Sequence, residues 1–89
     1  MHTIRLRAAW RIDGDRAVRR FNRPTGIEGE TRVWLAWDGD PAEARLNDAV
    51  LSAAARHDVT EALQPSNELV LSGANTATRE SVRLEIEPG

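Results

Sequence analysis

Residues 4–21, with the sequence IRLRAAWRIDGDRAVRRF, decide the fold class of this chain. Apolar side chains at every second position from 4 to 12 face away from Arg5, Arg7 and Arg11, which predicts a strand with one buried and one solvated face. Asp13-Gly14-Asp15 is typical of a hairpin turn, because Asp-Gly tolerates a positive φ. A second strand is therefore predicted over residues 16–21.

Alternation continues beyond this hairpin. Further strands are predicted by apolar periodicity and by flanking turn residues over 32–38, 42–46, 49–51, 68–72 and 82–87. Asn47-Asp48 is expected to form a tight turn between two of them. In the strand over 32–38, Trp34 falls on the face opposite Val33, Leu35 and Trp37.

The remaining segments are predicted to be irregular. Residues 51–56 are rich in alanine but too short for an independent helix, so a loop with about one turn is predicted. Asp58-Val59-Thr60-Glu61 is typical of the start of one helical turn, with Asp58 accepting from the amide of residue 61, or with Thr60 as the cap. Val59 and Leu63 are expected to point into the core. Residues 73–78 are predicted to be a polar loop.

Short strands separated by frequent turn signals are typical of an antiparallel β-sandwich or barrel. The sequence contains no evident crossover helix, so a parallel sheet is not expected. We therefore predict an all-β protein with about six to eight short strands in a single domain over residues 1–89.

The composition narrows the classes of function. The chain has 89 residues, a formal net charge of −2 and no cysteine. Neither disulfides nor thiolate metal sites can therefore support its small core. The charge favours no general attraction to nucleic acid or to an anionic membrane. Without the apolar core of a signal peptide, or a stretch of roughly 20 apolar residues, we expect a cytoplasmic protein.

Several short motifs follow one another in a defined order between residues 19 and 72. They are Phe21-x-x-Pro24, Arg32-Val33-x-Leu35, Leu46-Asn47-Asp48, Asp58-Val59-Thr60 with Leu63, and Asn67-x-Leu69. In this order they resemble the galactose-binding-like jelly-roll domain that precedes the catalytic domain of β-galactosidase- and β-glucuronidase-type glycoside hydrolases. Asp48 stands where that family has glycine, and aspartate tolerates the same left-handed backbone.

The resemblance implies a sandwich of jelly-roll type without catalytic residues, acting as a binding or scaffold module. For a carbohydrate ligand, the candidate binding residues are Trp34, Arg20, Asn22 and Arg45, with the flat indole ring as a stacking platform. The alternative is a protein-interaction or self-assembly module that uses the same face, which includes a homo-oligomer. In a third interpretation, a guanidinium from a neighbouring strand covers Trp34.

No group of residues predicts catalysis or a cofactor. His57 and Asp58 are adjacent, so in a strand they would point to opposite faces, and no nucleophile stands with them. Turn formation explains the aspartates of Asp13-Gly14-Asp15 and Asp38-Gly39-Asp40, although their oxygens would also suit a calcium ion. We therefore expect a protein that is not an enzyme and that needs no metal or cofactor.

Four arginines surround Phe21 in the sequence: Arg16, Arg19, Arg20 and Arg23. Basic residues interleaved with an aromatic are one pattern that binds single-stranded nucleic acid. In an acidic chain we favour a solvated basic edge, which also prevents edge-to-edge pairing of sheets. Nucleic acid is therefore not among the expected partners.

Overall fold

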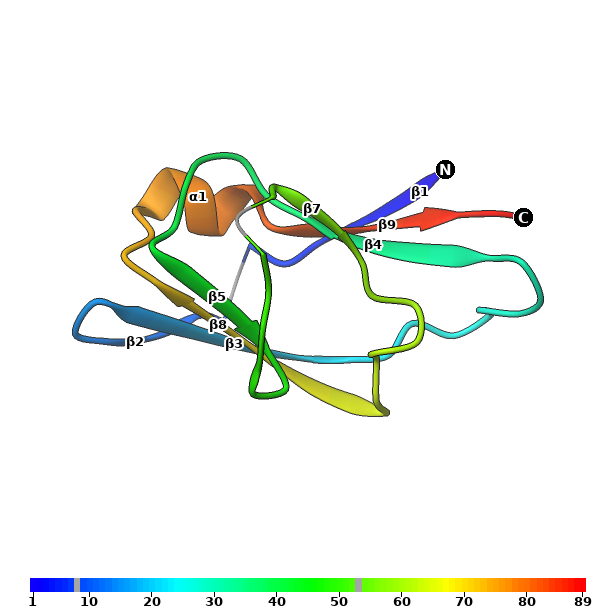
Figure 1. Ribbon diagram of the computed structural model, residues 1–89, viewed down its shortest axis with the longest axis horizontal. Helices are drawn as coiled ribbons and strands as arrows, with labels where there is room; N and C mark the ends of the chain where they lie inside the picture. Colours follow the sequence, from blue (N-terminus) through cyan, green and yellow to red (C-terminus); the bar gives the residue numbers. More distant parts are fainter. Residues whose placement is uncertain (8, 53) are drawn as a thin grey trace.

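The computed structural model describes residues 1–7, 9–52 and 54–89. Two antiparallel sheets pack face to face (Figure 1). The four-stranded sheet has the order β1 (His2–Arg5), β9 (Arg83–Glu87), β4 (Arg32–Ala36) and β7 (Arg56–Asp58). The five-stranded sheet has the order β2 (Arg11–Asp13), β3 (Arg16–Asn22), β8 (Ser66–Ser72), β5 (Glu43–Leu46) and β6 (Ala49–Val50). The predicted all-β antiparallel sandwich is confirmed, with nine strands in the described residues where six to eight were predicted.

Alternate side chains from the two sheets meet in the core. Val33 and Leu35 of β4 are fully buried, as are Leu69 and Leu71 of β8. Within its own sheet, Leu35 lies opposite the buried Leu84 of β9. Each buried leucine contributes about 1.5–3 kcal/mol through the apolar surface that it removes from water. Trp37 and Val82, just beyond β4 and just before β9, extend this core.

The N-terminal segment differs from the single strand predicted over residues 4–12. Its two ends belong to different sheets, as β1 and β2. Ala9 has a φ of 63°, which an extended chain cannot maintain, and the Trp10 Nε1 donates to the Leu6 carbonyl at 2.7 Å across the bend. Leu6 is consequently buried, whereas Ile12 is 53% exposed. Residue 8, predicted to share their face, lies outside the described residues.

Both predicted hairpin turns are confirmed. Asp13 pairs with Arg16 across a turn in which Gly14 has a φ of 63°. Asn47 and Asp48 join β5 to β6 with φ values of 50° and 69°. Two successive left-handed residues match the right-handed twist of the flanking strands, which is why such turns close tight hairpins.

The chain between β6 and β8 contains more strand than predicted. The loop expected over 51–56 ends at residue 55, because β7 begins at Arg56 and pairs with β4; residue 53 lies outside the described part. One turn then follows, in which the Leu63 amide donates to the Val59 carbonyl at 3.1 Å. Val59 and Leu63 are buried, as predicted.

The cap of this turn differs in one partner from the prediction. Asp58 Oδ1 accepts from the amide of Thr60 at 3.1 Å and from its hydroxyl at 2.6 Å, where residue 61 was the expected donor. The Thr60 Oγ1 in turn accepts from the Val33 amide at 2.8 Å. The motif therefore ties the turn after β7 to the start of β4.

The polar loop predicted over 73–78 is wrong from residue 76 onward, where α1 (Thr76–Ser81) begins. The Asn75 side chain caps this helix by accepting from the Thr78 amide at 2.8 Å. Thr78 is the buried residue of the helix, which closes one end of the sandwich (Figure 1). No helix within the described ranges is long and apolar enough to cross a membrane.

A buried amide joins three parts of the fold at the start of β8. Asn67 is 2% exposed, and its Oδ1 accepts from the Gln64 amide at 2.8 Å and from the Asn47 Nδ2 at 3.0 Å. Its Nδ2 donates to the Gln64 carbonyl at 2.8 Å and to the Phe21 carbonyl at 3.4 Å. Because unsatisfied buried polar groups are costly, this network specifies how the β5–β6 hairpin, β3 and β8 meet.

Replacing Asn67 by alanine should remove about 2 kcal/mol from the free energy of unfolding, because it leaves one buried and several partly buried hydrogen bonds unmade. Urea denaturation followed by tryptophan fluorescence measures this loss. Ser66→Ala, at the exposed neighbouring position, is the control and should cost less than about 0.5 kcal/mol. Equal stability of the two variants would contradict a structural role for the buried amide.

Candidate functional site

The structure divides the four candidate ligand-binding residues between opposite outer faces of the sandwich. Trp34 lies on the outer face of the four-stranded sheet, because its neighbours in β4 are buried. Arg20 and Asn22 lie on the outer face of β3, and Arg45 lies on the outer face of β5. The five-stranded sheet thus carries three of these residues, and Trp34 is separated from them by the core.

One face of the Trp34 ring is covered from within the chain. The guanidinium carbon of Arg56, on the neighbouring strand β7, lies 3.8 Å from the ring centroid. The indole Nε1 is buried and has no hydrogen-bond partner among the described residues. The interpretation in which a neighbouring guanidinium covers Trp34 is confirmed.

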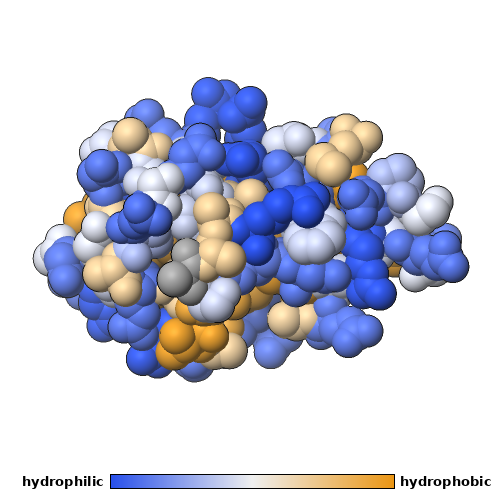
Figure 2. All heavy atoms as spheres, turned by 45° about the horizontal axis from the view of Figure 1, so that its top comes forward, coloured by the Kyte–Doolittle hydropathy of each residue, from blue (hydrophilic) through white to orange (hydrophobic). Residues whose placement is uncertain are grey.

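The surroundings of Trp34 form a network of charges. Glu85 accepts from the Arg56 Nε at 2.9 Å and from the Arg83 Nε at 3.3 Å, and Arg83 also reaches Asp38 at 3.3 Å. The hydrogen bond from Arg56 holds the pKa of Glu85 below its ordinary value of 4.5; burial opposes this effect and Arg83 reinforces it. Figure 2, which turns this side of the molecule forward, shows mostly hydrophilic residues.

Arg20 and Arg45 form ion pairs on the outer face of the five-stranded sheet. Arg20 Nε lies 3.3 Å from an oxygen of Glu68, which faces it across the ladder. Arg45 pairs with Glu43 on its own strand. The Arg20 side chain is 72% exposed, and pairs of this kind contribute roughly 0–1 kcal/mol. These contacts leave both arginines on an open, polar surface.

The histidine and the turn aspartates occupy structural positions. His57 Nε2 lies 2.7 Å from the Ala54 carbonyl, and its ring packs against Trp37 with centroids 5.2 Å apart. The aspartates of the two Asp-Gly-Asp turns are exposed at loop tips. Among the described residues, no three histidine, aspartate or glutamate side chains come together as metal ligands.

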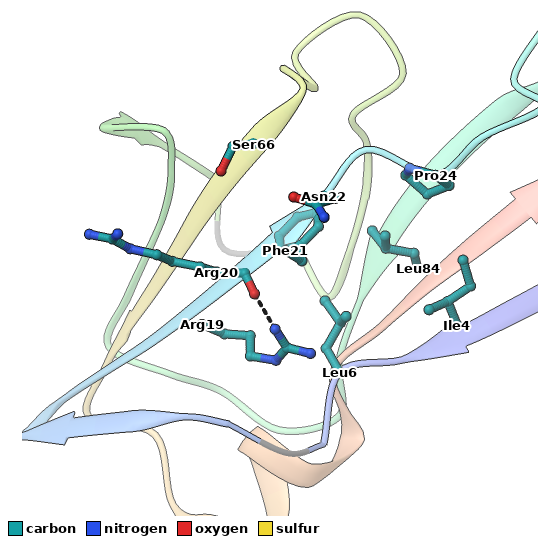
Figure 3. Close-up of a pocket in the computed structure, with 9 residues that line it drawn as sticks. All are labelled: Ile4, Leu6, Arg19, Arg20, Phe21, Asn22, Pro24, Ser66 and Leu84. Carbon is teal, nitrogen blue, oxygen red and sulfur yellow. Dashed lines mark hydrogen bonds between the residues drawn. The ribbon is translucent and has the colours of Figure 1, made fainter.

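A cleft of about 400 Å³ opens between β1 and the second half of β3 (Figure 3). Most of its lining is apolar and comes from Ile4, Leu6, Phe21, Pro24 and Leu84. Figure 3 shows Arg19 reaching from β3 toward Leu6, whereas Arg20 extends to the other side of the strand. The cleft therefore combines an apolar wall with one inward-directed guanidinium.

Among the described residues, the second half of β3, which borders this cleft, is paired on one side only. β8 pairs with the whole of β3, but β2 pairs only with residues 16–18. The Arg23 amide, just beyond β3, donates to the Pro65 carbonyl, just before β8. The backbone groups of the odd-numbered residues of β3 are therefore directed toward β8. Because alternate residues of a strand bond to opposite neighbours, the backbone groups of Arg20 and Asn22 point toward the cleft side.

Arg19 lies at the centre of this arrangement. Its position between Ala17 and Phe21, both buried, directs the side chain inward. The guanidinium donates to the carbonyl of Arg20, which is one of the groups on the unpaired edge. Its Nε is buried without a partner, and none of the ion pairs among the described residues includes it.

The sequence indicates this site through the position of Arg19, which the interpretation of the four arginines as a solvated basic edge did not take into account. Arg16, Arg20 and Arg23 are exposed, as that interpretation expected, but Arg19 is only partly exposed. The alternation of Ala17, Arg19 and Phe21 places a charge at an inward position, where charged residues are rare unless they are paired. The cleft is completed by residues from β1, the segment after it, β8 and β9, which no local pattern connects to β3.

No protein-family model, curated protein or solved structure matches this chain. The resemblance to galactose-binding-like domains therefore stays a prediction.

Glu85→Gln should make the melting temperature less dependent on pH. Because its pKa is lower in the folded chain, ionised Glu85 stabilises the fold fully above the ordinary value of 4.5, and this contribution disappears as the pH falls through the folded-state value. The variant should melt below the wild type near pH 7 and close to it near pH 2.5. Glu87→Gln, two residues along the same strand, is the control, and an equal deficit for Glu85→Gln at both pH values would contradict this linkage.

Proposed function

We propose that this chain is a non-catalytic binding module that recognises a protein partner through the cleft between β1 and β3. The observation that supports this most is the coincidence of an apolar cleft with an unpaired strand edge. Exposed edges of sheets are sites at which another chain adds a strand, with backbone bonds supplying affinity and side-chain pockets supplying specificity. The cleft between β1 and β3 is thus a specific surface for the protein-interaction module that the sequence offered as an alternative.

The same geometry gives less support to a carbohydrate ligand. Recognition of a sugar by stacking uses an accessible aromatic face with polar side chains around it. Arg56 covers one face of Trp34, and the other three candidates lie on the opposite side of the core. The large hydrophobic side chains exposed in the described residues are Met1, Ile12 and Val50, none of which is aromatic. Carbohydrate binding remains a prediction, which a glycan panel tests.

The proposal predicts that Ile4→Lys abolishes binding and that Thr3→Lys does not. Ile4 lines the cleft, and Thr3 is exposed at the adjacent position of β1. A phage library of random extended heptapeptides is selected on the wild type, and the enriched peptides are then titrated against both variants. We expect at least a roughly tenfold loss for Ile4→Lys and less than about twofold for Thr3→Lys.

Two controls make the result decisive. Thermal melts establish that Ile4→Lys is folded at the temperature of the titration. All three proteins are also applied to a panel of immobilised mono- and oligosaccharides. A glycan bound equally by wild type and Ile4→Lys, with no peptide enriched, would contradict the proposal in favour of a carbohydrate ligand.

A further inference from the structure

Resting on the proposed function, we infer that the cleft binds an extended segment of a partner protein as an added strand on β3, and that a carboxylate of this segment pairs with Arg19. The segment occupies the edge left free by β2, beside residues 19–22. It presents an acidic side chain and a large aliphatic side chain on the same face. The chemistry of the occupant follows from three features of the cleft.

The first feature is the set of backbone groups on the free edge. The amides and carbonyls of Arg20 and Asn22 point away from β8, and no strand of the described residues pairs with them there. In the free protein the Arg19 guanidinium donates to the Arg20 carbonyl. An incoming strand supplies an amide for the same carbonyl, which releases the guanidinium for another acceptor.

The second feature is the charge of the lining. Arg19 and Arg20 are the charged residues of the cleft, and no carboxylate lines it among the described residues. Glu68 already pairs with Arg20, whereas the buried Nε of Arg19 has no hydrogen-bond partner among the described residues. A guanidinium beside apolar side chains favours a carboxylate, which accepts two parallel hydrogen bonds from it. The partner segment is therefore acidic at the position that faces Arg19.

The third feature is the register that a strand on β3 must adopt. Partner residues opposite Arg19 and Phe21 point into the cleft, and the residue between them points outward beside Arg20. The partner residue opposite Phe21 would lie among the apolar side chains of Leu6, Phe21 and Leu84. The recognised pattern is thus an acidic residue and a large aliphatic residue two positions apart, with a polar residue between them.

A different protein suits this edge better than a second copy of the chain. The outer strands nearest to the cleft, β1 and β2, carry Arg5 and Arg11. Placing either of them beside Arg19 and Arg20 would bring like charges together, which is unfavourable. An arginine that covers its own strand edge also prevents indiscriminate pairing, in the way that inward-pointing charges protect other edges.

The test uses the peptide acetyl-Thr-Leu-Thr-Glu-Thr-Val-Thr-amide, labelled for fluorescence anisotropy. Its Leu, Glu and Val share one face when it is extended. One control peptide exchanges Glu with the preceding Thr, which moves the carboxylate to the other face at the same composition. A second control replaces Glu by Gln, and a third is N-methylated at the two Thr residues that flank Glu and so lacks two backbone donors.

We expect the Glu peptide to bind the wild type at least roughly tenfold more tightly than each control peptide. Arg19→Gln should lose about as much affinity for the Glu peptide and should no longer distinguish Glu from Gln. Arg16→Gln, which replaces an exposed arginine of β3 that does not line the cleft, should change the affinity for either peptide by less than about twofold. On binding, amide exchange at Arg20 and Asn22 should slow, as measured by NMR.

The inference is overturned if the Glu peptide fails to bind, if the exchanged peptide binds equally well, or if Arg16→Gln weakens binding as much as Arg19→Gln does. A wild-type dimer that Arg19→Gln dissociates would also overturn it, because the occupant would then be a second copy. If library peptides require Ile4 but not Arg19, strand addition with carboxylate pairing fails and the proposed function stands. If no peptide depends on Ile4, both fail.

Discussion

Asn67 lies where three parts of the chain meet, and its amide bonds to all of them. It satisfies the turn before β8, reaches the side chain of Asn47 in the β5–β6 hairpin, and donates to the Phe21 carbonyl of β3. Because the Phe21 carbonyl accepts from Asn67 of β8, the backbone groups of the odd-numbered residues of β3 are directed toward β8. The pairing of β3 with β8 therefore leaves the backbone groups of Arg20 and Asn22 on the side of the cleft.

The motifs on which the family resemblance depends have structural roles in this molecule. Asn47 and Asp48 form the left-handed hairpin turn, Asp58 and Thr60 tie a turn to β4, and Leu69 is a core residue. Each contributes to the geometry of a sandwich whether or not a ligand is bound. Motifs that resemble those of another family in this way therefore carry information about the fold, whereas function depends on the surfaces that the fold presents.

Arg19 affects both the stability of the free protein and the access of other chains to the edge of β3. An unpaired edge beside an apolar cleft invites pairing with other chains, and an inward guanidinium prevents it by covering a carbonyl of that edge. The Nε of the same guanidinium is buried without a hydrogen-bond partner among the described residues, and a buried polar group without a partner costs free energy. An acidic strand would remove that cost while completing the sheet, which gives the edge selectivity.

The sequence alone determined the features that depend on neighbouring residues. Period-two alternation located β3, β4, β5, β8 and β9, and residues that tolerate positive φ located the turns at Gly14 and at Asn47-Asp48. The tertiary structure decided where residues 4–12 change sheets, because their alternation is the same on both sides of Ala9. It also decided that β7 forms, because pairing with β4 stabilises a strand that is short by itself. The cleft likewise depends on the tertiary structure, since β1, β3 and β9 all contribute to its walls. These features arise from contacts between distant segments, which no local pattern encodes.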